Sequence, residues 1–301
     1  MPGLCAPIVT IGTFDGIHLG HRQIFRRMRE ISAETGAKTV VVTFDPHPRF
    51  VLNGNENPVK LLNTPEKKYR RIEEQGIDYL LVIRFTPEFA SLSPEQFVVD
   101  YLVKYLHIGM LVIGHDHHFG KSRGGDYKSA EHLGEKYHFR VEEVSEVVVD
   151  GVEISSTKIR AALKEGDIAL ANKLLGYPYD ITGEVVHGNQ IGRTLGFPTI
   201  NIEIPSLYKL IAANGVYACR VLIHGDWFNG MCNIGMRPTI PNSPRTMEVH
   251  VFDFDKDIYG ATVEVAFIER LRDEMKFDGL DALRQQLQRD KIEVEKILIK
   301  G

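Results

Sequence analysis

Four short segments contain residues whose types and spacing suit phosphate chemistry. The first, GTFDGIHLGH, places Gly12, Gly16, His18 and His21 at the end of an apolar run, residues 7–14. The glycines let backbone N–H groups approach a ligand, and imidazoles three residues apart in a helix point to one side. Such a cradle suits a transition state in which charge builds on a departing pyrophosphate. The alternative is a glycine turn with two solvated histidines.

The second segment, ISSTKIR, opens a helix that follows a strand. Ser156 and Thr157 offer hydroxyl groups at the helix N-terminus, and Arg160 adds positive charge. By itself Ser156 is typical of an N-cap. Together with the first segment, it indicates the far wall of a triphosphate pocket.

The third segment, GNQIGRTLGFPTIN, is a glycine-rich loop that leads into a strand. The amides around Gly192 and the charge of Arg193 could bind phosphates. Thr199 and Asn201 are two residues apart and therefore share one face of the strand. A hydroxyl and an amide oxygen side by side suit Mg²⁺, a hard cation that also binds substrate phosphates. An ordinary strand after a turn is the alternative.

The fourth segment, RTMEVHVFDFDKDIYG, supplies a candidate base. Glu248 shares a strand face with His250 and Phe252. A carboxylate in a closed site could accept the proton of an attacking hydroxyl group. A glutamate in a strand is usually exposed to solvent, so Glu248 alone is weak evidence for a base. The neighbouring motifs decide whether it is one.

The elements that position these segments change character near Pro178. Before it, apolar runs alternate with helical patterns, which predicts a Rossmann-like parallel sheet flanked by helices. Predicted strands cover residues 7–14, 38–44, 78–85, 110–115 and 141–149. Predicted helices cover residues 22–35, 64–76, 93–106 and 129–137, with Gly36 and Gly76 closing the first two and a capping box at Ser93 and Gln96.

After Tyr179 the strands are short, glycine turns separate them, and no helix is expected until Leu280. This pattern predicts an antiparallel β-barrel or sandwich capped by a C-terminal helix. We expect two domains, residues 1–178 and 179–301.

Net charge, hydropathy and cysteine content argue against several classes of protein. The 301 residues carry a formal net charge of -4, which disfavours sequence-independent nucleic-acid binding. No apolar run reaches the length of a membrane span. The three cysteines are too far apart for a disulfide framework. We expect a reduced, cytoplasmic protein that acts on small molecules, with no nucleic-acid, membrane or obligate protein partner.

Three patterns imitate other sites. GHDHHFGKS resembles a Walker A loop but has five residues between its glycines, and Gly124 and Gly125 would break the required helix. VVVD, residues 147–150, imitates a Walker B strand. His115, His117 and His118 could suggest zinc, but no thiol lies near them in sequence. A loop that faces a ligand, or is merely polar, is favoured.

With these segments in view, the first half resembles the nucleotidylyltransferase superfamily, and specifically the prokaryotic bifunctional riboflavin kinase/FAD synthetase family. TFDPHP (residues 43–48) and GHDHHFGKSRGGD (residues 114–126) also match its pattern. The resemblance implies that FMN attacks the α-phosphorus of ATP and releases pyrophosphate. It implies ATP contacts from Gly12, Phe14, Gly16, His18, His21, Ser156, Thr157 and Arg160, and a flavin side lined by Phe44, His47 and Asp116.

The second half resembles the riboflavin kinase module through GRTLGFPTIN, NGVYA, NIGMRPT and EVHVFDFDKDIYG. By this resemblance Thr199 and Asn201 bind Mg²⁺ with ATP, Glu248 activates the ribityl hydroxyl of riboflavin, and Arg272 lies beside the flavin ring. Ile200 replaces the family's usual alanine and should alter only packing. Members often carry more residues before the first strand, so we expect a missing edge element or a shortened chain.

Two rival hypotheses remain. The first half could use another acceptor, such as a phosphopantetheine or a sugar phosphate, because the histidine motif alone does not select one. The chain could also be a flavin-binding protein without catalysis. That rival predicts that the motif residues have been replaced. The sequence retains every one of them: His18, His21, Thr199, Asn201 and Glu248.

Overall fold

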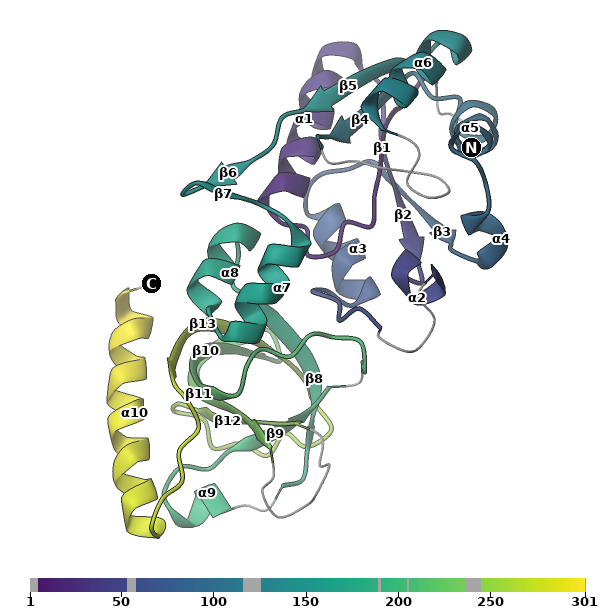
Figure 1. Cartoon of the computed structure of the whole chain (residues 1–301). Helices are drawn as coiled ribbons and strands as arrows, with labels where there is room; N and C mark the ends of the chain where they lie inside the picture. Colours follow the sequence, from purple (N-terminus) through teal and green to yellow (C-terminus); the bar gives the residue numbers. More distant parts are fainter. Residues whose placement is uncertain are drawn as a thin grey trace. The chain divides into compact units, whose positions relative to one another are not determined.

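The computed structural model describes residues 5–52, 58–115, 126–188, 191–204, 206–236 and 245–300. By internal contacts the chain divides into two compact units, residues 1–156 and 157–301 (Figure 1). The expected division of the chain after residue 178 stays a prediction.

A five-stranded parallel sheet forms the centre of the first unit. Its strands are β1 (Ile8–Ile11), β2 (Thr39–Asp45), β3 (Tyr79–Arg84), β4 (Met110–Gly114) and β5 (Arg140–Val144). Their order is β3-β2-β1-β4-β5, and every neighbouring pair is parallel. The predicted parallel sheet is confirmed, and its order puts the ends of β1 and β2 side by side.

Helices cover both faces of this sheet (Figure 1). They are α1 (Leu19–Thr35), α2 (Pro48–Leu52), α3 (Pro65–Glu73), α4 (Pro87–Ala90), α5 (Pro94–Phe97), the π-helix η1 (Val98–Tyr105) and α6 (Tyr127–Tyr137). Val41 packs with Phe25 and Met28 of α1, whereas its neighbour Val40 packs with Leu102 of η1. Successive strand residues thus bury against opposite helical layers.

The predicted helix boundaries have identifiable caps. The Thr64 hydroxyl accepts a hydrogen bond from the backbone N–H of Lys67, and Ser93 and Gln96 form the predicted capping box. Gly36 ends α1 in the left-handed conformation, with φ of 73°.

The stretch 141–149 differs from its prediction as one strand. β5 ends at Val144, and β6 (Val148–Val149) pairs with β7 (Val152–Glu153) in an antiparallel hairpin. The intervening Asp150 and Gly151 both have positive φ, 50° and 76°, which is the conformation of a tight hairpin turn. The VVVD segment is therefore part of this hairpin and not a Walker B strand.

A closed antiparallel barrel forms most of the second unit and confirms the predicted fold class. Its strands are β8 (Asp180–Val186), β9 (Ile200–Glu203), β10 (Gly215–Ile223), β11 (Asp226–Met236), β12 (Arg245–Val251) and β13 (Thr262–Arg272). Their order around the barrel is β10-β11-β12-β9-β8-β13. α7 (Ser156–Glu165) and α8 (Ile168–Leu175) precede the barrel, and α10 (Leu280–Lys300) follows it.

One helix between Tyr179 and Leu280 was not expected. α9 (Ile191–Thr194) lies in the glycine-rich loop, where the sequence predicted no helix. The carbonyl of Gly192 accepts hydrogen bonds from the backbone N–H groups of Leu195 and Phe197, at 3.2 Å and 2.8 Å. These bonds let the loop close a single turn despite its glycines.

The two faces of the barrel strands have different surroundings. Met247 and Val249 of β12 are 2% and 0% exposed and alternate with Glu248 and His250. His250 pairs with Met231, which packs against α10 from outside. Glu248 therefore lies on the outer face, the one that α10 partly covers, while Met247 and Val249 fill the interior.

Within the described ranges, none of the helices combines the length and apolar character needed to span a bilayer. The thiols of Cys5, Cys219 and Cys232 are all free. Burial raises the pKa of the Cys219 and Cys232 thiols, which keeps both protonated and unreactive.

Candidate active sites

The turn after β1 has an unusual backbone. Phe14, Gly16 and Ile17 all have positive φ, at 48°, 92° and 39°. Phenylalanine and isoleucine rarely adopt this conformation, which costs about 1–3 kcal/mol per residue and persists where the surroundings impose it. Both side chains are buried, Phe14 at 2% exposure and Ile17 at 0%, and this packing holds the turn.

This turn delivers the two histidines to the start of α1. His18 is the N-cap, and its Nδ1 accepts a hydrogen bond of 3.3 Å from the backbone N–H of His21. The two imidazole rings stack with centroids 3.6 Å apart, and the rings of Phe14 and His21 lie nearly perpendicular with centroids 5.2 Å apart. The predicted side-by-side placement of the histidines is present, at a helix N-terminus that favours anions.

The ring of His21 is neutral and, in the described part of the chain, has an unsatisfied nitrogen. Burial, and then the neighbouring His18, lower the pKa of His21 well below its usual value, so its ring is neutral near pH 7. Its Nδ1 is buried and has no hydrogen-bond partner within the described residues. A buried unpaired ring nitrogen is costly without a partner, and an approaching phosphate oxygen would provide one.

Ser156 meets the histidine turn. Its hydroxyl donates a hydrogen bond of 2.8 Å to the backbone carbonyl of Asp15. Ser156 is the first residue of α7, whereas an N-cap is the residue before the helix. The alternative interpretation of Ser156 as a simple N-cap therefore does not account for its contact with Asp15. Thr157 and Arg160 belong to the second compact unit, and their predicted ATP contacts stay a prediction.

The predicted flavin side of this unit is aromatic. Phe44, at the end of β2, packs against Phe85 and Phe89 with ring centroids 5.5 Å and 5.7 Å away. His47 follows β2 and packs at 5.8 Å from Phe50. Asp116 lies outside the described residues, as does the Walker-like segment after His115. His115 itself contacts Glu143, with Nδ1 and Oε1 3.1 Å apart.

Two buried charges near the turn were not predicted as site residues. The Asp15 carboxylate accepts hydrogen bonds from the backbone N–H groups of Leu62 and Asn63 at 3.0–3.1 Å. Lys68 extends from α3 toward the ends of β1 and β2. Asp15 stands inside the quoted motif, whereas Lys68 looks like one more charge on a solvated helix.

In the barrel, three polar residues form a row on its outer face. Glu248 of β12 pairs directly with Asn201 of β9 on one side and with Asn233 of β11 on the other. Directly paired residues in a sheet have Cβ atoms about 4.5–5.5 Å apart and point to the same face. The sequence prediction named Asn201 and Glu248 but not Asn233, whose place follows only from the strand register.

Asn201 is tightly enclosed. It is 8% exposed, and a Cβ atom on Gly188 would lie 2.0 Å from its Nδ2. Only glycine lets the loop backbone approach this amide so closely. Gly188 is the first glycine of the segment that predicted a phosphate loop.

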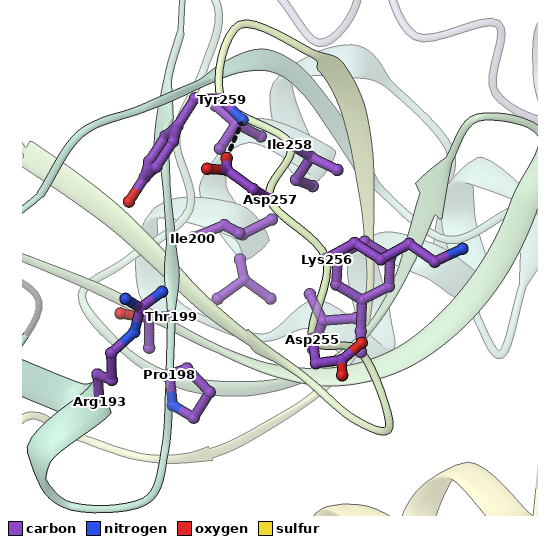
Figure 2. Close-up of a pocket in the computed structure, with 13 residues that line it drawn as sticks. Arg193, Pro198, Thr199, Ile200, Asp255, Lys256, Asp257, Ile258 and Tyr259 are labelled. Atoms are coloured by element: carbon purple, nitrogen blue, oxygen red, sulfur yellow. Dashed lines mark hydrogen bonds between the residues drawn. The ribbon is translucent and has the colours of Figure 1, made fainter.

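A pocket of about 350 Å³ opens beside Thr199. Figure 2 shows the Arg193 guanidinium next to Thr199 at one end of the pocket and Tyr259 toward the other. The apolar walls come from Val185, Val249 and other barrel residues, and Asp255, Lys256 and Asp257 follow along the rim. Apolar walls with a few polar groups are typical of a small-molecule site, but these walls lie on the interior face of the strands, opposite to Asn201 and Glu248.

His250 fixes the segment that carries Thr199. Its Nδ1 lies 2.7 Å from the carbonyl oxygen of Pro198, and because a carbonyl only accepts, this nitrogen is the donor. Burial lowers the pKa of His250, which keeps the ring neutral.

Arg272 takes part in a buried ion pair. Its Nη2 lies 2.6 Å from Oδ2 of Asp290 on α10, and Nε lies 3.1 Å from Oδ1. Gln286 donates a further hydrogen bond of 2.8 Å to this carboxylate. The guanidinium also lies over the ring of Phe277 at 6.0 Å. Its predicted place beside a flavin ring stays a prediction.

Comparisons with known proteins match each of the two units to a different enzyme family model. The family model for FAD synthetase matches residues 4–158, and that for riboflavin kinase matches residues 175–298. The bifunctional riboflavin kinase/FMN adenylyltransferase of Bacillus subtilis is 39% identical over 292 residues, covering 95% of this chain and 90% of its own. That of Haemophilus influenzae is 40% identical over 283 residues, covering 94% and 91%.

The chain belongs to the bifunctional riboflavin kinase/FMN adenylyltransferase family. The resemblance found in its motifs is thereby confirmed, and so is the presence of both enzyme activities. A phosphopantetheine or sugar phosphate acceptor is disfavoured, because relatives that match nearly the full length act on flavins.

A solved structure described as a macrolide-efflux protein from Streptococcus pneumoniae shares this architecture. It is 33% identical, with a TM-score of 0.90, and the match covers 98% of this chain and 95% of that one. Its description differs from those of the two family models and of the bifunctional relatives. The FMN adenylyltransferase assignment rests on the first unit's matches and the riboflavin kinase assignment on the second's.

Proposed function

We propose that the riboflavin kinase reaction takes place on the outer face of the barrel around Glu248. The terminal ribityl hydroxyl of riboflavin attacks the γ-phosphorus of ATP, Glu248 accepts the hydroxyl proton, and ADP leaves. The observation that supports this most is the direct pairing of Glu248 with Asn201 across β12 and β9. It puts a candidate base beside a candidate metal ligand.

ATP and Mg²⁺ are proposed to bind between the glycine-rich loop and the outer face of the barrel, next to Asn201 and Glu248. Gly192 and Arg193 contact the phosphates from the loop, and Thr199 and Asn201 provide a hydroxyl and an amide oxygen for the metal. These donors fit a hard cation, and the close approach of Gly188 holds the Asn201 amide in place. Mg²⁺, when bound, neutralises charge on the phosphates.

In the FMN adenylyltransferase unit we propose that ATP binds at the strained turn. A phosphate oxygen of FMN attacks the α-phosphorus, and pyrophosphate leaves toward His18 and His21. No covalent nucleophile is needed, because positioning and charge stabilisation suffice. The residues proposed to bind ATP here are Gly12, Phe14, Gly16, His18, His21 and Ser156.

The unpaired Nδ1 of His21 supports this placement most directly. Phe44 and His47 are proposed to line the flavin side. The expected cytoplasmic location and the expected lack of an obligate protein partner stay predictions.

Two variants test the assignment of two separate sites. His21→Ala should abolish formation of FAD from FMN and spare formation of FMN from riboflavin, and Glu248→Ala should do the reverse. Each product is measured by chromatography after incubation with ATP and Mg²⁺. Parallel loss of both activities in both variants would show that the assignment is wrong.

A further inference from the structure

Lys68 is a buried lysine at the ligand-facing edge of the FMN adenylyltransferase sheet. It lies in the first turn and a half of α3, next to Lys67, and only 9% of it is exposed. A lysine on a surface helix normally keeps its ammonium group in water. Burying the charge is unfavourable unless the surroundings supply acceptors.

Three acceptors surround the Lys68 ammonium. Its Nζ lies 3.4 Å from the carbonyl oxygen of Thr13, 3.2 Å from the hydroxyl of Thr43 and 3.2 Å from the carbonyl oxygen of Phe44. The Thr43 hydroxyl in turn donates a hydrogen bond of 3.3 Å to the Thr13 carbonyl. The lysine therefore joins the turn that carries the two histidines to the end of the strand that carries the flavin-side residues.

Two carboxylates compensate the charge. Asp15 and Asp45 both favour the charged form of Lys68, although burial outweighs them and lowers the pKa of the amine. Asp15 is itself 3% exposed and held by backbone N–H groups of the segment before α3. One connected network thus contains the histidine turn, the end of β2 and the start of α3.

The geometry points to Lys68 as a positioning residue for adenylyl transfer. It sets the distance between the ATP phosphates at the histidine turn and FMN beside Phe44, so that the FMN phosphate oxygen faces the α-phosphorus in line. This inference rests on the proposed placement of the two substrates in this unit. Each substrate keeps its own contacts without Lys68, but the two lose their alignment.

Loss of alignment has a characteristic kinetic signature. A displacement of about 1 Å between reacting groups can lower the rate about 100-fold. Binding of each substrate to its own loop changes less, so kcat should fall while KM stays nearly constant. A lysine that only filled the core would lower thermal stability without this selective loss of kcat.

The main test compares Lys68→Met with Arg70→Met. Methionine keeps most of the length of the side chain and removes the ammonium group. Arg70 lies on the same helix, and its side chain is 70% exposed, so its variant removes a charge without touching the network. For Lys68→Met we expect kcat for FAD formation to fall about 10- to 100-fold, with the KM of ATP and of FMN changed less than about threefold.

The same chain provides an internal control. Phosphorylation of riboflavin by the barrel should be unchanged in both variants. An unchanged kcat in folded Lys68→Met, or a loss confined to KM, would overturn the inference. An equal loss of kinase activity would do so as well, because it would indicate general damage.

A second variant keeps the test decisive if Lys68→Met does not fold. Thr43→Val removes one acceptor and the link to Thr13 while preserving side-chain shape. We expect a smaller fall in kcat for FAD formation, about 3- to 10-fold, with little change in KM. A wild-type kcat in this variant would refute the positioning role. Failure of His21→Ala to affect FAD formation would instead refute the proposed ATP site, so the two failures are distinguishable.

Discussion

The ion pair between Arg272 and Asp290 should hold α10 on the riboflavin kinase barrel, and its contribution can be measured. The side chains are 18% and 4% exposed. Asp290→Ala leaves the guanidinium partly buried without its carboxylate, and breaking a buried pair in this way costs about 3–5 kcal/mol. With a urea dependence of about 2 kcal/mol per M, the unfolding midpoint of this unit should fall by about 2 M.

The single tryptophan of the chain makes the assay selective. Trp227 lies in β11, so its fluorescence in urea reports on the barrel and not on the adenylyltransferase unit. Glu293→Ala is the matched control on the same helix. It breaks an exposed pair with Lys296, with side chains 60% and 56% exposed, and should cost no more than about 1 kcal/mol.

The double variant Arg272→Met/Asp290→Leu completes the test. Apolar replacements of a buried ion pair are often neutral or stabilising, so most of the stability lost in Asp290→Ala should return. If Asp290→Ala shifts the midpoint no more than Glu293→Ala does, the ion pair does not hold α10 on the barrel. A double variant as unstable as the single one would also exclude the unpaired charge as the cause of the loss.

Four further outcomes follow from the two sites. Gly188→Ala should displace the Asn201 amide and lower riboflavin kinase activity at least about tenfold, with FAD formation from FMN retained. Riboflavin kinase activity equal to that of the wild type would show that the position of the Asn201 amide does not matter for the reaction. A chelator should abolish riboflavin phosphorylation and added Mg²⁺ should restore it; activity without divalent ions would remove the proposed metal. Because the pKa of His21 is lowered in the folded chain, the unfolded chain binds more protons below about pH 6.5. The free energy of unfolding should therefore decrease as the pH falls below about 6.5, and His21→Asn should reduce this slope in urea titrations followed by circular dichroism. ATP should favour the protonated ring, so calorimetry in buffers of different ionisation enthalpy should detect proton uptake that His21→Asn lacks.

The sequence predicted the features that depend on local patterns. Alternating apolar runs predicted the parallel sheet, and Thr64, Ser93 and Gly36 predicted the helix ends that are present. Closely spaced pairs such as His18 and His21 were also predictable, because three residues in the first helical turn fix their relation.

Features that depend on distant residues could not be predicted in this way. Asn233 joins Glu248 only through the register of β11 with β12, and Asp290 reaches Arg272 only through the docking of α10. Lys68 stands among charged neighbours, and nothing in its own segment distinguishes it from a solvated side chain. The hairpin at Asp150 was missed because a run of valines outweighed its turn residues.

The alternation of faces along β12 ties the chemistry of the kinase to the packing of its core. Met247 and Val249 fill the barrel while Glu248, between them, faces the proposed substrates. Insertion or deletion of a single residue ahead of Met247 would turn the carboxylate inward and the apolar side chains outward at once. Length variation in this module should therefore be confined to its loops, and this strand should accept substitutions but not changes in length.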